Sequence, residues 1–175
     1  NHLLLKKEIS TYNFIFGNTA SGINQNFDML LEEKSIYRVP EFDLAFFEIK
    51  NTPPKKNIMN LFSNSSFKGV FNGTYIMRES TGGVDRVGLK NIHLNKNQYV
   101  MQPVNATMPC WVATSSRDTL NGECGSMMIA NTPSGPVILG MHVAGGRMNA
   151  VNAIHVTKDH IDDAIKHFGT FMVQR

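Results

Sequence analysis

The chain has 175 residues, 42% of them hydrophobic and 18% charged, a composition that favours folding and excludes a disordered polypeptide. No apolar run approaches the ~20 residues of a membrane-spanning helix, so we expect no membrane association. The net charge of +3 permits contact with nucleic acid without requiring it, and two cysteines are too few for a disulfide framework, which favours a reducing compartment.

The first third of the chain is predicted to consist of strands. Aromatic residues alternate over 12–16, turn residues follow, and an apolar segment resumes at 27–31. The segment "EFDLAFFEI" (41–49) is apolar enough for a further strand. The next segment, "KNTPPKKN" (50–57), ends it with two prolines and a basic cluster, and a connection between two units is therefore expected here.

The middle of the chain is a series of short apolar segments separated by Gly, Asn, Pro and Ser. Such spacing is typical of a β-sandwich or β-barrel, so an all-β fold is predicted. The segments are "GTYIMRES", "RVGLKNIHL", "QYVMQPV", "CWVATSS", "SMMIAN", "PVILGMHVAGG" and "NAVNAIHV".

Only the tail has a helical pattern. Thr157 is a plausible N-cap, acidic residues follow it, and Gly169 comes after the last apolar residue. These signals predict a short amphipathic closing helix over 158–169 that packs on the strands. Its apolar residues recur at helical spacing, at Ile161, Ala164, Ile165 and Phe168.

The segment "NGECGSMMIANTPSGPVILGMHVAGG" (121–146) contains a candidate nucleophile. A thiolate that attacks a carbonyl needs access, a base, and donors for the oxyanion. Glycines at 122 and 125 allow a tight turn that exposes the sulfur of Cys124, and the N–H groups of Gly122, Glu123 and Cys124 can line an oxyanion hole. A buried cysteine in a glycine-rich turn is the alternative interpretation of the same four residues.

A base for Cys124 has to come from six histidines. His160 and His167 belong to the predicted helix, where they are expected to face solvent, and His93 and His155 lie within predicted strands. A papain-like order would place the base after the cysteine. His155 follows Cys124 by only 31 residues, against ~130–150 in that arrangement, so this order is disfavoured.

The motifs "TLNGECGS" and "GMHVAGG" together resemble those of the picornavirus-type cysteine proteases, the picornains. These motifs lie in residues 117–156, and the resemblance extends more loosely to the whole chain. It implies an enzyme with a chymotrypsin-like double β-barrel that processes a viral polyprotein in the host cell cytoplasm. It also implies a Cys–His–Asp mechanism without metal or cofactor, and the chain order His…Asp/Glu…Cys of chymotrypsin.

The resemblance assigns the catalytic triad residue by residue. Cys124 becomes the nucleophile, and Asp43 in "DLAFFEI" becomes the orienting acid, with Glu41 and Glu48 as competitors on the same predicted strand. His2 becomes the base, because it precedes Asp43 by 41 residues, as in the family. It would take the thiol proton and later protonate the leaving amine.

The family also implies how the chain divides. Picornains have a helix and opening strands before the catalytic histidine, and this chain has none, so an incomplete first barrel is expected. The predicted parts are an N-terminal barrel over 1–52, a connection over 53–72, a C-terminal barrel over 73–157 and the helix over 158–169.

Substrate selection follows from the same resemblance. The family cleaves after glutamine and sometimes glutamate, and His142 and Thr119 are implied as donors to that side-chain carbonyl. A buried structural histidine is the alternative for His142. An extended substrate would add its backbone hydrogen bonds along the strand edge formed by Val143, Ala144, Gly145 and Gly146.

Picornains bind viral RNA as well, through a basic motif in the connection between the barrels. Lys55 and Lys56 keep positive charge there but the motif itself is absent, so a solvated basic linker is the favoured interpretation. An RNA-binding or structural barrel with incomplete catalytic machinery is the alternative to the enzyme. The motifs do not define an oligomeric state.

Overall fold

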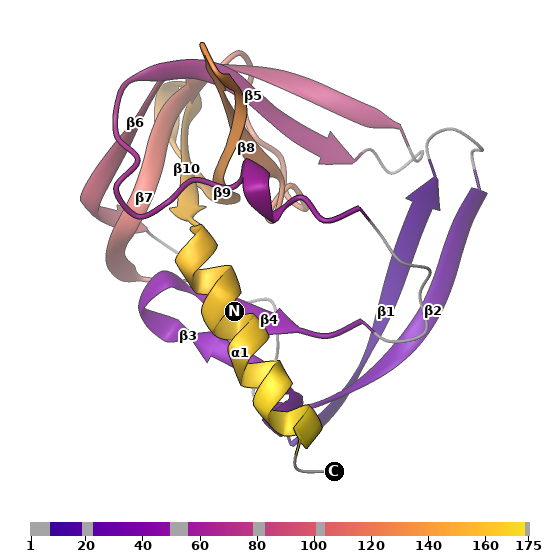
Figure 1. The fold of residues 1–175 in the computed structure, drawn as a ribbon. Coiled ribbons are helices and arrows are strands. Elements are labelled where there is room, and N and C mark those ends of the chain that lie inside the picture. The colour runs from indigo at the N-terminus through magenta and orange to yellow at the C-terminus, as the bar shows by residue number, and fades with distance from the viewer. Residues whose placement is uncertain (1–7, 19–22, 50–55, 79–82, 101–103, 174–175) are drawn as a thin grey trace.

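The computed structural model describes residues 8–18, 23–49, 56–78, 83–100 and 104–173. These residues form mostly strands, and one α-helix closes the described chain (Figure 1). The elements are β1 (Ile9–Asn18), β2 (Ile23–Glu32), β3 (Ile36–Val39), β4 (Leu44–Phe47), β5 (Phe71–Arg78), β6 (Val84–Val100), β7 (Ala106–Ser115), β8 (Met127–Thr132), β9 (Gly135–Gly145), β10 (Ala150–His155) and α1 (Lys158–Val173).

Six antiparallel strands close into a barrel in the order β10-β7-β6-β5-β8-β9. Side chains from its strands, among them Ala113 of β7, fill the barrel with a core around Trp111 and Tyr75, which are both fully buried. The β8–β9 hairpin turns between Thr132 and Gly135, and Gly135 takes a left-handed φ of 115°. The expected series of short strands is therefore a closed barrel.

One strand of the barrel is longer than predicted. Residues 86–94 and part of the segment 98–104 belong to a single strand of 17 residues, β6. Its pairing with β7 shifts register twice, and Asn91 takes a positive φ of 56° at the first shift. Such bulges let a long strand bend around a barrel without ending, so the polar residues near them do not mark a turn.

The N-terminal part forms two separate ribbons within the described residues 8–18 and 23–49. β1 pairs with β2 over ten residues and this ribbon lies to one side of the barrel, while β3 pairs with β4 over four (Figure 1). A second core joins the β3–β4 ribbon to the barrel. Its buried members are Leu44, Val100, Met108, Cys110, Val143, Ile154 and Val156.

The predicted strand 41–49 is wrong in its first part. Pro40–Phe42 form a 3-10 turn, Asp43 takes a left-handed conformation at φ 50°, and β4 begins only at Leu44. Pro40 fixes a helical φ, and aspartate tolerates the left-handed region better than most residues, so a turn forms here. Glu41 and Asp43 therefore do not alternate along one strand.

The closing helix begins as predicted and ends later. The side chain of Thr157 accepts the N–H of His160 at 3.3 Å, which is the expected N-cap. The helix continues through Gly169 to Val173, because it lies against the β3–β4 ribbon (Figure 1). The expectation that His160 and His167 face solvent is wrong, since their rings pack against Phe42 at 4.5 Å and Tyr37 at 4.9 Å. No helix of the described ranges is long and apolar enough to cross a bilayer.

Candidate active site

Cys124 lies in the connection between β7 and β8, next to β9. Its half-buried thiol is 3.6 Å from the carbonyl oxygen of Val143. Gly122 and Gly125 have φ values of 94° and 91°, which favour glycine and explain why glycines flank the cysteine. The turn is tied to β9 by a hydrogen bond of 2.8 Å from the N–H of Gly125 to the carbonyl of His142.

The three N–H groups predicted to line an oxyanion hole are not equivalent. The N–H of Glu123 donates to the carbonyl of Leu120 at 3.3 Å, so it is engaged within the turn. Among the described residues no such backbone acceptor is found for the N–H groups of Gly122 and Cys124. Those two groups remain the candidates for an oxyanion hole.

Asp43 is buried, with 6% of its surface exposed, whereas its competitors Glu41 and Glu48 are exposed. It immediately precedes Leu44, which shares the second core with Val143 of β9. This packing brings Asp43 to the side of the barrel that carries Cys124. Burial raises the pKa of the Cys124 thiol, and the negative charge of Asp43 raises it further, although the backbone N–H of Cys124 partly opposes this.

The predicted base, His2, lies outside the described residues, so its role stays a prediction. The hydrogen bonds of the described part of the chain pair no histidine ring with the Cys124 thiol. His142 contacts Tyr75, and His155 contacts Ser63.

His142 is buried on β9, with 4% of its surface exposed. Its Nδ1 lies 3.2 Å from the hydroxyl of Tyr75, a residue that the sequence analysis did not single out. Burial lowers the pKa of His142, and the charge of Glu123 and a hydrogen bond to the backbone of Asn152 only partly oppose this shift. Burial raises the pKa of Tyr75 well above its ordinary value, with smaller effects in the same direction from Cys110 and Cys124. Both side chains are therefore uncharged at neutral pH.

The remaining predicted substrate residues lie along the end of β9. Thr119 is so close to Gly145 that a side chain at 145 would overlap its hydroxyl oxygen. β8 pairs with β9 only up to Met141, so one edge of the strand beyond this point has no strand partner in the described structure. The side chain of Val143 is buried in the second core, while Ala144 is half-buried and Gly145 and Gly146 are exposed.

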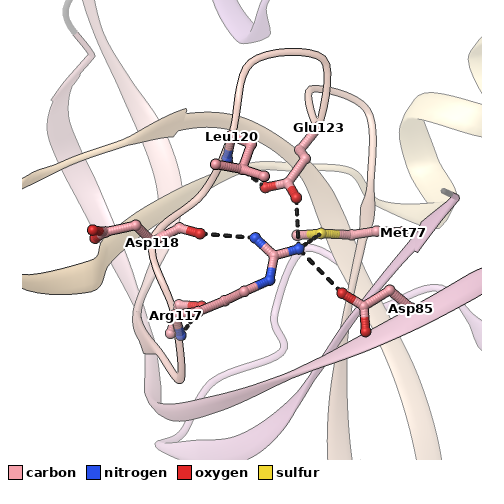
Figure 2. A network of polar contacts seen from close by, with 7 residues as sticks. Met77, Asp85, Arg117, Asp118, Leu120 and Glu123 are labelled. Carbon is pink, nitrogen blue, oxygen red and sulfur yellow. Dashed lines mark hydrogen bonds and ion pairs between the residues drawn. The ribbon is translucent and has the colours of Figure 1, made fainter. Parts of the chain in front are cut away.

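Arg117 is a second residue that the sequence analysis missed. Its guanidinium lies between Asp85 and Glu123, the residue just before Cys124 (Figure 2). Neither Arg117 nor Tyr75 belongs to a recognisable motif, because each contacts a residue far away in the sequence. Of the two predicted RNA contacts, Lys56 is exposed and Lys55 lies outside the described residues.

Known proteins match this chain in structure, and none matches it in the sequence comparisons. No family model matches the sequence, and no curated protein matches it significantly. The chain is similar to an inactive mutant of the murine norovirus NS6 protease, extended at its C-terminus to include residues of NS7. The TM-score is 0.53 at 15% identity, over 71% of this chain and 72% of that chain. The fold is chymotrypsin-like.

A second NS6 structure supports the same assignment. It is also an inactive mutant, extended by one residue of NS7, and matches with a TM-score of 0.52 at 14% identity over 71% of this chain and 76% of that chain. The alignment to the NS6 protease from murine norovirus 1 spans about half of each chain, 54% of this one and 52% of that one, with a TM-score of 0.43 at 17% identity. The two matches with TM-scores above 0.5 confirm the chymotrypsin-like fold predicted from the sequence, and Cys124 lies beside the end of β9 within it.

Proposed function

We propose that the protein is a cysteine endopeptidase that cleaves a viral polyprotein after glutamine. The position of Cys124 carries the proposal: its half-buried thiol lies in a glycine-flanked turn beside the end of β9, where one edge has no strand partner among the described residues, within a chymotrypsin-like fold. The neighbours support the substrate class. One of them is a chimeric NS6 protease, similar with a TM-score of 0.50, whose extended C-terminus carries residues of a cleavage junction.

The proposed reaction begins with the thiol of Cys124. Because burial and Asp43 raise its pKa, the thiol keeps its proton at pH 7 and requires a base, which we assign to His2. The resulting thiolate attacks the carbonyl carbon, and the N–H groups of Gly122 and Cys124 stabilise the oxyanion. His2 then gives its proton to the leaving amine, water hydrolyses the acyl-enzyme, and Asp43 holds His2 in the required tautomer.

Neutral His142 explains a preference for glutamine. Because the hydroxyl of Tyr75 keeps its proton, it can donate to Nδ1, which leaves the ring proton of His142 on Nε2. An N–H donor of this kind suits the amide oxygen of glutamine. The hydroxyl of Thr119, packed against Gly145, supplies a second donor.

The first experiment measures cleavage of a peptide that contains one glutamine junction, together with alkylation of the two cysteines by iodoacetamide. We expect Cys124→Ala to abolish cleavage and Cys110→Ala to retain it. Iodoacetamide should modify Cys124 and stop the reaction. Cys110 should stay unmodified because it has no exposed surface and burial raises its pKa to about 12. Cleavage by the Cys124→Ala variant, or inactivation through Cys110 alone, would contradict the proposal.

Viral RNA remains a proposed second partner, and the host cell cytoplasm the proposed compartment. The chain presents Lys56 at its surface, and Lys55 precedes it in the sequence. If these lysines contact phosphates, RNA affinity falls with salt on a log–log plot, by a slope of about one per phosphate contacted. A slope near zero would exclude the contact.

A further inference from the structure

We propose that Arg117 is a positioning residue: it acts through Glu123 to hold the nucleophile turn, residues 120–125, in the conformation that presents Cys124 and its N–H donors. Its catalytic consequence rests on the proposed protease function. Its structural consequence can be measured whatever chemistry the site performs.

The contacts of Arg117 join the turn to the barrel (Figure 2). Its Nη2 donates to Glu123 at 2.6 Å and to Asp85 of β6 at 3.1 Å, and lies 3.5 Å from the sulfur of Met77 on β5. Its Nη1 donates to the carbonyl of Asp118 at 2.8 Å. One side chain therefore connects two strands of the barrel to Asp118, just before the turn, and to Glu123 within it.

Glu123 links Arg117 to the backbone of the turn. One carboxylate oxygen accepts from Arg117, and the other accepts the N–H of Leu120 at 2.7 Å. The N–H of Glu123 in turn donates to the carbonyl of Leu120 at 3.3 Å. The side chain and the backbone of Glu123 thus close a ring over residues 120–123, immediately before Cys124.

Packing does not fix the two glycines of the turn. A Cβ built on Gly122 or on Gly125 would have no neighbouring atom within 4 Å, so both lie in open space. Glycine is also the residue with the greatest backbone freedom. The direction of the N–H groups of Gly122 and Cys124 therefore depends on polar contacts. On its far side the turn is also held by the bond from the N–H of Gly125 to the carbonyl of His142, by the bond from the N–H of Ser126 to the carbonyl of Glu123, and by the contact of the Cys124 thiol with the carbonyl of Val143.

The chemistry of the pair suits a rigid connection. The Glu123 side chain is only 14% exposed, and although burial alone would raise its pKa, the hydrogen bonds from Arg117 and Leu120 outweigh this and lower it. Glu123 is therefore ionised at neutral pH and its bonds are charge-assisted. A guanidinium can donate hydrogen bonds to Glu123, Asp85 and Asp118 at once, because its N–H groups are held in one rigid plane. A lysine ammonium is a single point charge on a flexible chain.

The test compares Arg117→Ala and Arg117→Lys with Arg86→Ala. Arg86 is exposed on β6 and follows Asp85 in the sequence. Arg86→Ala therefore removes one positive charge beside Asp85, as Arg117→Ala does. Hydrogen exchange of the full chain, followed by mass spectrometry, reports the amides of 118–125 against those of the barrel strands. We expect exchange in 118–125 to be about tenfold faster in Arg117→Ala, intermediate in Arg117→Lys, and unchanged in Arg86→Ala.

The catalytic readout is kcat per active site, counted by titration with an irreversible thiol reagent, on the glutamine peptide. We expect Arg117→Ala to lower it by about tenfold or more, because a misplacement of ~1 Å can cost ~10²-fold. Arg117→Lys should recover part of the loss, and Arg86→Ala should match the wild type. If Arg117→Ala does not fold, hydrogen exchange and kcat per active site are both measured on Arg117→Lys instead.

Each outcome decides one of the two proposals. Exchange in 118–125 that is the same in Arg117→Ala and the wild type would overturn the positioning role. Faster exchange with an unchanged kcat per titrated site would overturn its catalytic consequence. Faster exchange in a protein whose wild type cleaves no glutamine peptide would overturn the protease function and leave the positioning of the turn standing.

Discussion

Tyr75 and His142 form a pair in which burial sets the protonation of both members. Tyr75 has no exposed surface, His142 has 4%, and their rings meet edge to face with centroids 5.1 Å apart. Burial disfavours both the tyrosinate and the imidazolium, so a protonated hydroxyl and a neutral ring share this contact. In the proposed arrangement the hydroxyl donates to Nδ1, which selects the tautomer of His142 with its proton on Nε2, and with it the polarity of the glutamine pocket.

This pairing predicts the behaviour of Tyr75→Phe. The variant keeps the buried ring and loses only the hydroxyl, so the protein should fold while the tautomer of His142 is no longer imposed. A net hydrogen bond is worth about 1 kcal/mol, and we expect kcat/KM on the glutamine peptide to fall by about fivefold. Steady-state kinetics measure it, with Tyr99→Phe as the matched control, because Tyr99 is 54% exposed on β6. A kcat/KM equal to that of the wild type would show that Tyr75 does not orient His142.

At the scale of elements, the start of α1 is defined by a reciprocal pair of hydrogen bonds. The N–H of His160 donates to the hydroxyl of Thr157, and the N–H of Thr157 donates to Nδ1 of His160, both at 3.3 Å. Thr157 is 3% exposed. The geometry is that of a capping box with histidine in the place of the usual glutamate or glutamine. This cap begins the helix just where the barrel ends.

The cap predicts a stability difference between Thr157→Ala and Thr157→Ser. Both variants lose the buried methyl group, but only the serine keeps the hydroxyl that accepts the N–H of His160. Loss of an N-cap costs about 1 kcal/mol, so the alanine variant should be less stable than the serine variant by about that amount. Urea unfolding measures the free energy of each. Equal stabilities would mean that the hydroxyl does not cap α1.

Local patterns predicted those elements that local chemistry determines. The N-cap at Thr157 and the glycine-flanked turn at Cys124 each follow from residues a few positions apart. The long strand β6 did not, because its bulges depend on pairing with β7. The end of α1 did not either, since a cap signal at Gly169 was overridden by packing on the β3–β4 ribbon.

The residues of the candidate site show the same difference between local signals and distant contacts. Motifs identified Cys124 and His142, and burial distinguishes Asp43 from Glu41 and Glu48. Tyr75 could not be found in the sequence, because its partner His142 is 67 residues away. Arg117 belongs to no motif: Glu123 is six residues away, but Asp85, which ties it to the barrel, is 32 residues away. Contacts between strands that are distant in sequence carry no local signal, and they are the contacts that orient the side chains of a site.

At the scale of the whole molecule, His155 lies at the junction between the barrel and α1. It ends β10 with 5% of its surface exposed, its ring packs against Trp111 at 5.5 Å, and its Nε2 is 3.4 Å from the hydroxyl of Ser63. The backbone carbonyl of Ser63 accepts the N–H of Lys158 at 2.9 Å. Burial, and to a smaller degree the charge of His160, lower the pKa of His155 to about 4.

The buried imidazole makes the stability of the whole fold depend on pH. The unfolded chain takes up a proton on this residue below its ordinary pKa of about 6.5, whereas the folded protein does not until about pH 4. The free energy of unfolding is therefore complete above pH 6.5 and falls as the pH drops toward 4, with a slope of up to about 1.4 kcal/mol per pH unit. His142 and His160, whose pKa values burial also lowers, add to the fall in the same direction.

The variant His155→Gln should reduce this dependence. It removes the titrating group, so the fall in unfolding free energy between pH 6.5 and 4.5 should become shallower by up to one proton's slope, while above pH 7 the two stability curves should run parallel. Urea titrations followed by the fluorescence of Trp111, the single tryptophan, measure both proteins across this range. If the slopes are equal between pH 6.5 and 4.5, another group is responsible for the loss of stability, and the junction at His155 is not the acid-sensitive point of the fold.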